Sequence, residues 1–173
     1  GSCHTSPRLA GSPDGKWVYM IAAKYDKNTS TGDVVLRAPA DGSQRAVLFA
    51  GDRNKSGSDN THFNRPLGID CDAQGRVYVA DSLNNRIQVF SPEGKCLGGI
   101  KVERPGLVRV HQKTGALYVQ HEARIGGASV SRLTKFVSFE KPAEAFHADH
   151  EQCQVLALDS WSENPRLLIA GPN

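Results

Sequence analysis

The chain lacks the cysteine spacing of zinc-ribbon and thiol-redox proteins. Its 173 residues include only four cysteines, and no two of them are spaced as Cys-x-x-Cys. Zinc ribbons and thioredoxin-like proteins depend on such pairs, so both classes are without support. Two disulfides would form only in an exported protein, which leaves the state of the thiols open. The four residues are Cys3, Cys71, Cys96 and Cys153.

Long apolar runs and several catalytic motifs are missing as well. No stretch approaches the roughly 20 apolar residues that cross a bilayer, and no signal peptide is present. We therefore expect a soluble chain without a membrane span; its localisation stays open, with an exported compartment slightly favoured. There is no Gly-x-Ser-x-Gly, no P-loop and no Gly-x-Gly-x-x-Gly after a strand, so hydrolases, nucleotidases and dehydrogenases of these types have no support.

The charge is weak and spread along the chain. The formal net charge is +3, and the lysines and arginines form no basic run. A nucleic-acid partner is therefore not favoured by composition. The 17 glycines and nine prolines suit many short strands and turns better than long helices.

A turn followed by an apolar strand occurs four times. Tyr78, Tyr118 and Leu168 take the same place in three copies, and Tyr19 falls in register with them when one extra residue after the turn glycine of its copy is allowed for. Repeats at intervals of about 40 residues are typical of propeller blades. The copies are 14–20, 74–80, 114–120 and 164–170.

The stretch from Phe63 to Gly94 holds three short strand patterns in succession. The strands are expected at 69–72, 76–80 and 87–90, with tight turns between them. Connections this short favour antiparallel neighbours, because a parallel crossover needs a dozen or more residues. The stretch therefore predicts a meander that makes up most of one blade.

The same residues resemble a known repeat. The sequence Phe-Asn-x-Pro-x-Gly-Ile, then Gly-x-Val-Tyr-Val-Ala-Asp-Ser-x-Asn-x-Arg-Ile-Gln-Val-Phe, is similar to an NHL repeat, the blade unit of one class of β-propeller. The resemblance implies an all-β fold of four-stranded antiparallel blades. It does not settle a function, since one fold hosts many activities.

The whole chain is expected to be one partial propeller domain of about three and a half blades. Residues 24–32 and 121–127 are interpreted as long loops. Residues 140–152 are a poorly patterned surface segment, in which 141–146 are the candidate fourth strand of the third blade and Pro142 argues against a central strand. A partial ring leaves apolar faces exposed, so we expect either the rest of a longer chain or a homodimer to complete it. The blades are predicted at 8–51, 63–102, 104–150 and 154–173.

One polar cluster is predicted to be structural. Asp81, Asn84, Asn85 and Arg86 follow the second strand of the resembling repeat. Aspartate and asparagine readily bond the backbone in turns. We expect these side chains to tie the connection between the second and third strands.

Two histidine segments are candidate metal sites, for zinc or calcium. His62 precedes an inner strand, where a related class of propeller, the peptidyl-hydroxyglycine lyase, holds a metal with histidines. His147 and His150, three apart, would share one face of a helical turn, with Asp149 beside them and His121 and Glu122 as further candidates. No cofactor is the favoured expectation, because the other inner-strand entries supply no matching histidines. Gluconolactonase-like sites need inner carboxylates, for which Asp70 and Asp159 are the candidates.

A non-catalytic binding module is the favoured function. Loops on a rigid propeller frame bind a protein or glycan, and 24–32 and 121–127 should emerge on one face. The alternatives are a metal-dependent lyase or lactonase, and single-stranded RNA binding as in some NHL proteins, for which Lys101 is a further contact. Candidate ligand residues are Lys24, Arg65, Arg104, Arg109 and Arg124.

Overall fold

The computed structural model describes residues 9–26, 29–150 and 155–170. Nearly all regular structure in these residues is β-strand, arranged as three four-stranded sheets and one two-stranded sheet. Within each sheet the strands pair antiparallel in chain order. The all-β class and the partial set of propeller blades predicted from the sequence are thus confirmed. No described helix combines the length and apolar character that spanning a membrane requires.

The first two sheets are complete blades. Their strand bounds follow the expected turns closely in the second blade and less closely in the first. The first blade comprises β1 (Leu9–Gly11), β2 (Trp17–Asp26), β3 (Thr29–Pro39) and β4 (Val47–Gly51). The second comprises β5 (Pro66–Cys71), β6 (Val77–Asp81), the 3-10 turn η1 (Ser82–Asn84), β7 (Arg86–Phe90) and β8 (Cys96–Lys101).

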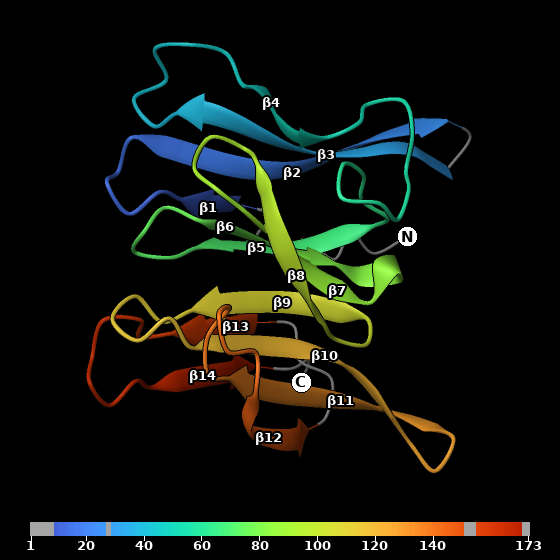
Figure 1. Ribbon diagram of the computed structural model, residues 1–173, viewed down its shortest axis with the longest axis vertical. Helices are drawn as coiled ribbons and strands as arrows, with labels where there is room; N and C mark the ends of the chain where they lie inside the picture. Colours follow the sequence, from blue (N-terminus) through green and yellow to red (C-terminus); the bar gives the residue numbers. More distant parts are fainter. Residues whose placement is uncertain (1–8, 27–28, 151–154, 171–173) are drawn as a thin grey trace.

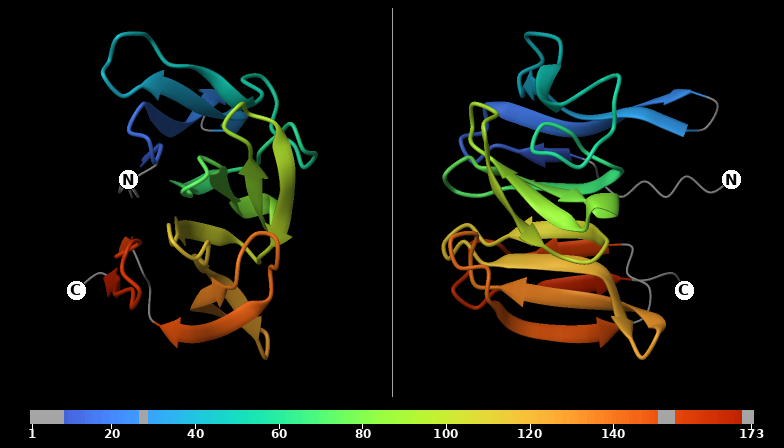
Figure 2. Two further views of the ribbon diagram at one scale, coloured as in Figure 1. Left: turned by 60° about the vertical axis from the view of Figure 1, so that its left-hand side comes forward. Right: turned by 45° about the vertical axis from the view of Figure 1, so that its right-hand side comes forward.

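The third blade is also complete, and the fourth has two strands. The sheets face one another in an open arc, with the inner strands β1, β5, β9 and β13 as successive neighbours (Figures 1 and 2). The third blade comprises β9 (Pro105–Val110), β10 (Leu117–Ile125), β11 (Ala128–Phe136) and β12 (Glu144–His150). The fourth has β13 (Val155–Leu158) and β14 (Leu167–Ala170).

Two expected loops are strands instead, and the fourth strand of the third blade lies slightly later than its candidate place at 141–146. The loop predicted at 24–32 is wrong, because β2 and β3 continue to Asp26 and from Thr29. The loop predicted at 121–127 is wrong as well: β10 and β11 extend to a tight Gly126-Gly127 turn with positive φ at both residues. The poorly patterned segment contains β12, an edge strand mostly exposed on both faces. A strand that runs beyond the core pairs through its main chain and needs no alternation of apolar and polar residues. The hydrophobic pattern therefore could not predict strands in these segments.

The core lies in the seams between blades. We call the contact between the first and second blades the first seam, and that between the second and third the second seam. Tyr19 belongs to the first seam, Tyr78 to the second, and Tyr118 to the contact with the fourth blade. Each tyrosine therefore points toward the following blade, as the shared register predicts. Leu168, the fourth member, is 62% exposed, against 8% or less for the tyrosines, because no further blade covers it in the described residues.

Close approach of the inner strands explains one glycine. A Cβ at Gly68 of β5 would lie 2.6 Å from the carbonyl oxygen of Gly106 in β9. Only a residue without a side chain fits between two backbones at this distance. The inner strands β5 and β9 thus come into close backbone contact at Gly68.

Candidate functional site

The second and third strands of each complete blade are joined at one side of the molecule, which we call the hairpin side. On this side of the second blade, the carboxylate of Asp81 holds several groups in place. Its Oδ1 accepts the backbone N–H of Asn64 at 2.7 Å. Its Oδ2 accepts Asn84 Nδ2 and Arg86 Nε, both at 2.8 Å. Asp81 is fully buried, and that burial raises its pKa while the three hydrogen bonds oppose the rise.

The partners of Asp81 reach outward and hold the loop before the second blade. Asn84 Nδ2 also donates to the Gly57 carbonyl at 2.8 Å, and Arg86 Nη2 donates to the carbonyls of Asp59 and His62. Asn85 takes a left-handed conformation with φ 54°, and its Oδ1 accepts the N–H of Arg104 at 2.9 Å. These side chains are engaged in tying one blade to its neighbours.

His62 sits in that loop between two aspartates. Its Nδ1 lies 2.7 Å from Asp59 Oδ1, and its Nε2 lies 3.8 Å from Asp52 Oδ2. The ring is largely covered, since its side chain is 13% exposed. Hydrogen bonds from His62 and Thr61 to the Asp59 carboxylate hold the pKa of Asp59 well below its usual range. His62 is thus held as a loop-stabilising group.

The β12 candidates do not share a helical face. Successive side chains of a strand point to opposite faces, so His147 and Asp149 lie on one face and His150 on the other. Asp149 accepts two hydrogen bonds from Arg132, at 2.6 and 3.0 Å, and His147 pairs with Glu144. The helical-turn interpretation of this segment is wrong, because 144–150 pair with β11.

His121, the further candidate, is buried within the third blade. Its Nε2 lies 2.9 Å from Thr134 Oγ1, and its Nδ1 faces the carbonyls of Glu103 and Glu122. Burial lowers its pKa, which favours the neutral ring. The strand register places His121, Arg132 and Asp149 in one row across three strands, with the arginine between the histidine and the carboxylate.

The structure does not gather the predicted metal ligands. His62 belongs to the loop before β5, whereas His147, Asp149 and His150 belong to β12 of the next blade. Among the described residues, no group of three or more His, Cys, Asp or Glu side chains is placed to hold a metal ion. Asp159 caps a turn through Trp161 and Ser162. The thiols of Cys71 and Cys96 are free, and Cys3 and Cys153 lie outside the described residues.

The predicted ligand arginines lie on two parts of the molecule. Arg104 pairs with Glu122 at 3.3 Å and Arg124 with Glu103 at 3.6 Å, both on the hairpin side. Arg65 is exposed there, with a positive φ of 55°. Arg109 lies on inner strand β9 and donates to the Val108 carbonyl. The side chain of Lys24 lies outside the described part of the chain.

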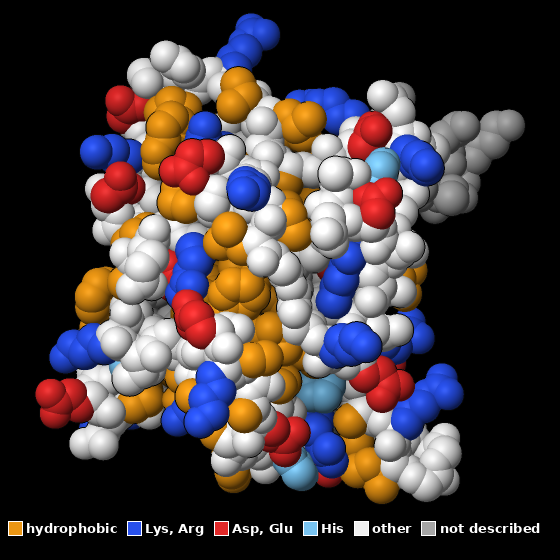
Figure 3. Space-filling view, in the orientation of Figure 1, with side chains coloured by type: hydrophobic (Ala, Val, Ile, Leu, Met, Phe, Trp, Pro, Cys, Tyr) orange, Lys and Arg blue, Asp and Glu red, His pale blue; other side chains and the backbone are white. Residues whose placement is uncertain are grey.

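Charges of both signs are mixed over the face shown in Figure 3. The pairs Arg104–Glu122, Arg124–Glu103 and Arg132–Asp149 show how this mixing arises on the hairpin side. Single-stranded RNA binding needs a continuous basic groove with aromatic side chains. The paired arginines do not supply such a groove.

Two hollows open on the opposite side, where turns join the first and second strands of each blade; we call this the turn side. The hollow at the first seam has a volume of about 250 Å³ and is lined by Trp17, Tyr19, Pro13 and Pro92 among others. The hollow at the second seam has a volume of about 350 Å³ and is polar. The turn residue Gln74 lines both. The residues of the polar hollow are Gln74, Arg76, Gln112, Lys113, Thr114, Gly115, Ser138 and Glu140.

The hollows were missed from the sequence, although their residues stand in recognised turns. Gln74 and Lys113 occupy the turns before two of the four aligned strands, and Trp17 begins another. The repeat pattern explains why each turn exists, and it contains no information on what two adjacent turns enclose. One feature of the sequence could have indicated the hollows: these turns carry amide, cationic and aromatic side chains, whereas purely structural turns often carry small ones.

The sequence of the second blade matches a described family. Residues 63–90 fit the family model of the NHL repeat. Residues 63–90 are an NHL repeat. Protein lin-41 of Caenorhabditis elegans is 50% identical to this chain over 40 residues, which make up 23% of this chain and 4% of lin-41. The Asp81 network described above lies inside this NHL repeat.

Solved structures share the fold at low sequence identity. Hydrazine synthase of Kuenenia stuttgartiensis superposes with a TM-score of 0.58 and 17% identity over 86% of this chain, which spans 38% of that chain. The calcium-binding protein regucalcin of Agrobacterium tumefaciens has a TM-score of 0.48 and 19% identity, covering 68% of this chain and 38% of its own. A luciferin-regenerating enzyme has the same TM-score and identity, with 65% and 36% covered. The likeness to hydrazine synthase concerns the fold alone, and it agrees with the partial β-propeller in which the NHL repeat stands.

Proposed function

We propose that the chain is a non-catalytic β-propeller module that binds an extended segment of another protein on its turn side. The observation that carries the proposal is the pair of neighbouring hollows that share Gln74. Together they offer an apolar, aromatic-lined subsite next to a polar one, which is the usual composition of a recognition site. The rigid blades hold both subsites in place.

The hairpin side is the weaker candidate for this role. Asn84 and Arg86 are engaged with the loop before the second blade, and Arg104 and Arg124 are paired with glutamates. A ligand there would first have to break these contacts. The turn side offers two preformed hollows.

Selection from a displayed library of random 12-residue peptides tests the proposal. We expect selected peptides to bind with micromolar Kd, measured by fluorescence anisotropy. Gln74→Trp would fill the rim shared by the hollows and abolish binding. The control, Arg124→Trp, introduces the same side chain at an exposed position on the hairpin side. Failure to select any peptide would overturn the proposal, as would loss of binding in the control alone.

A further inference from the structure

The polar hollow at the second seam contains an arginine whose orientation is set by the fold. Arg76 Nε donates to Asp72 Oδ2 at 2.5 Å, and the guanidinium lies 5.6 Å from the ring centre of Phe139 and 6.0 Å from that of Tyr78. Asp72 is itself fixed, because it accepts N–H groups of its own turn and the hydroxyl of Tyr78 at 2.9 Å. Arg76 therefore presents a preorganised cation to the hollow.

A carboxylate from the neighbouring blade forms an ion pair with this arginine. Glu140, in the turn between β11 and β12, pairs with Arg76 Nη1 across the second seam. Its side chain is 61% exposed, and the contact with Arg76 lowers its pKa. An ion pair with one partner this exposed contributes about 0–1 kcal/mol, so an incoming carboxylate can replace Glu140 at little cost.

Lys113 adds a second positive charge at the rim of the same hollow. It is exposed, and no described side chain pairs with it. Gln112 stands next to it with Nε2 held by the carbonyls of Cys71 and Val110, which fixes its amide in the wall. Once Glu140 is displaced, Arg76 and Lys113 leave the hollow suited to an anionic group.

The adjoining hollow selects an apolar group. Trp17, Tyr19, Pro13 and Pro92 supply its apolar lining, while Ser12, Asp14 and Gln74 stand in the same wall. The guanidinium of Arg37 lies 4.4 Å from the centre of the Trp17 ring. Arg37 thus covers one face of the indole. An aromatic or proline side chain can still enter from the open side of the hollow.

We infer that the two hollows bind one extended acidic peptide, whose aspartate or glutamate replaces Glu140 on Arg76 while an apolar side chain enters the Trp17 hollow. The inference rests on the proposed function and adds a ligand class to it. Glu140 then acts as an internal competitor, present whenever the peptide is absent. Neutralising this residue has the opposite effect to neutralising Lys113.

Binding of a defined peptide set to the full chain tests the inference. The probes are acetylated, amidated 12-residue peptides with one phenylalanine or proline and one glutamate at varied spacings, each matched by a glutamine version. Glu140→Gln is expected to tighten binding of the glutamate peptides about threefold to tenfold, and Lys113→Gln to weaken it by a similar factor. Arg124→Gln on the hairpin side is the control and should change nothing. Both test positions are exposed, so folding should be preserved.

The outcomes separate the two levels of the proposal. If peptides bind but the glutamine versions bind equally well, or if Glu140→Gln weakens binding, the acidic-peptide inference is overturned while the binding module stands. If no peptide of either set binds and none is selected from the random library, the binding module itself fails. Binding of neutral oligosaccharides that competes at Gln74 would replace the peptide by a glycan.

Discussion

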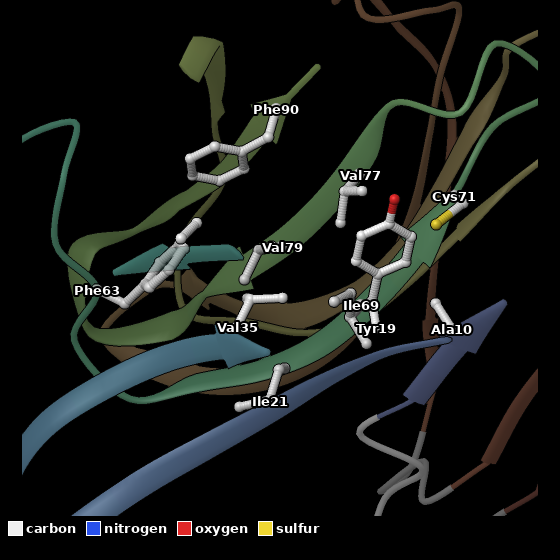
Figure 4. Packing of buried hydrophobic residues seen from close by; sticks show 11 residues of the cluster. Ala10, Tyr19, Ile21, Val35, Phe63, Ile69, Cys71, Val77, Val79 and Phe90 are labelled. Atoms are coloured by element: carbon white, nitrogen blue, oxygen red, sulfur yellow. The ribbon is translucent and has the colours of Figure 1, made fainter. Parts of the chain in front are cut away.

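The two complete seams solve the same packing problem with different side chains. The first seam joins aromatic rings edge to face: Tyr19 to Phe49 at 4.9 Å, Phe49 to Phe90 at 6.2 Å and Phe63 to Phe90 at 5.7 Å. Figure 4 shows Tyr19, Phe63 and Phe90 among the buried residues of this seam. The second seam is mostly aliphatic, with Ile87, Val89, Val108 and Leu117 among its fully buried members.

The seams differ more in their polar groups. At the inner-strand position beside the aligned tyrosine, the first seam has Ala10 and the second has Asp70. Near the turn side, the first seam carries a lone arginine over aromatic rings, whereas the second carries the Asp72–Arg76–Glu140 chain of ion pairs. Equivalent positions of the repeat therefore point their side chains the same way. The residue types at those positions differ between the seams, so each hollow has its own chemistry.

Removing a ring should separate the seams most clearly. Phe63 is 1% exposed and packs edge to face on Phe90. We expect Phe63→Ala to lower the free energy of unfolding by about 4 kcal/mol, because a cavity opens and an aromatic contact is lost. Urea denaturation measures the change. Phe139→Ala, a partly buried ring of the second seam, should cost clearly less, and equal losses would contradict the comparison.

A pH profile should distinguish the seams next. Asp70 Oδ2 accepts the N–H of Val110 at 2.8 Å, and burial raises the pKa of Asp70 to about 6, although this hydrogen bond and Arg109 oppose the rise. Between about pH 4 and 6 the unfolded chain releases this proton before the folded chain does. The contribution of Asp70 to the free energy of unfolding is therefore fully present below pH 4 and is lost as the pH rises through 6.

The variant Asp70→Asn should remove that loss. An amide stays neutral and can still accept the Val110 N–H, so the variant should match the wild type near pH 3.5 and exceed it at pH 8 by up to about 3 kcal/mol. Denaturation at both pH values measures the difference. Parallel profiles of the two proteins would show that Asp70 has an ordinary pKa.

A methyl group at the inner edge of the second seam should have a smaller effect. In Gly68→Ala the new Cβ would meet the backbone of Gly106 and Leu107, which cannot move aside without shifting β9. We expect a loss of about 2 kcal/mol, measured by thermal unfolding. Gly11→Ala is the control in the first blade, since its Cβ would meet no atom within 4 Å. A tolerated Gly68→Ala would mean that the inner strands are farther apart.

The sequence predicted the features that recur in every blade, such as the position of the second strand. It missed the features that differ between blades, such as strand ends and contacts between neighbouring blades. Turn–strand spacing correctly placed Tyr19, Tyr78 and Tyr118 in one register, because alternation along a half-buried strand is a strong signal. It failed at β12 and at the ends of β2 and β10, where strands project beyond the core and carry polar residues. The proximity of Arg76 and Glu140 could not be predicted, since it depends on how two blades meet rather than on either blade's pattern.

The smallest expected effect concerns the arginine of the first seam. Arg37 lies over the Trp17 ring and donates Nη1 to the Pro92 carbonyl at 2.9 Å, which links the two blades. Lysine keeps the charge but not the planar, stacking group, so Arg37→Lys should cost about 0.5–1 kcal/mol. Chemical denaturation should show this loss, whereas Arg45→Lys at an exposed position should show none. If lysine is fully tolerated, charge alone suffices at the first seam, and the planar stacking contact adds no measurable stability there.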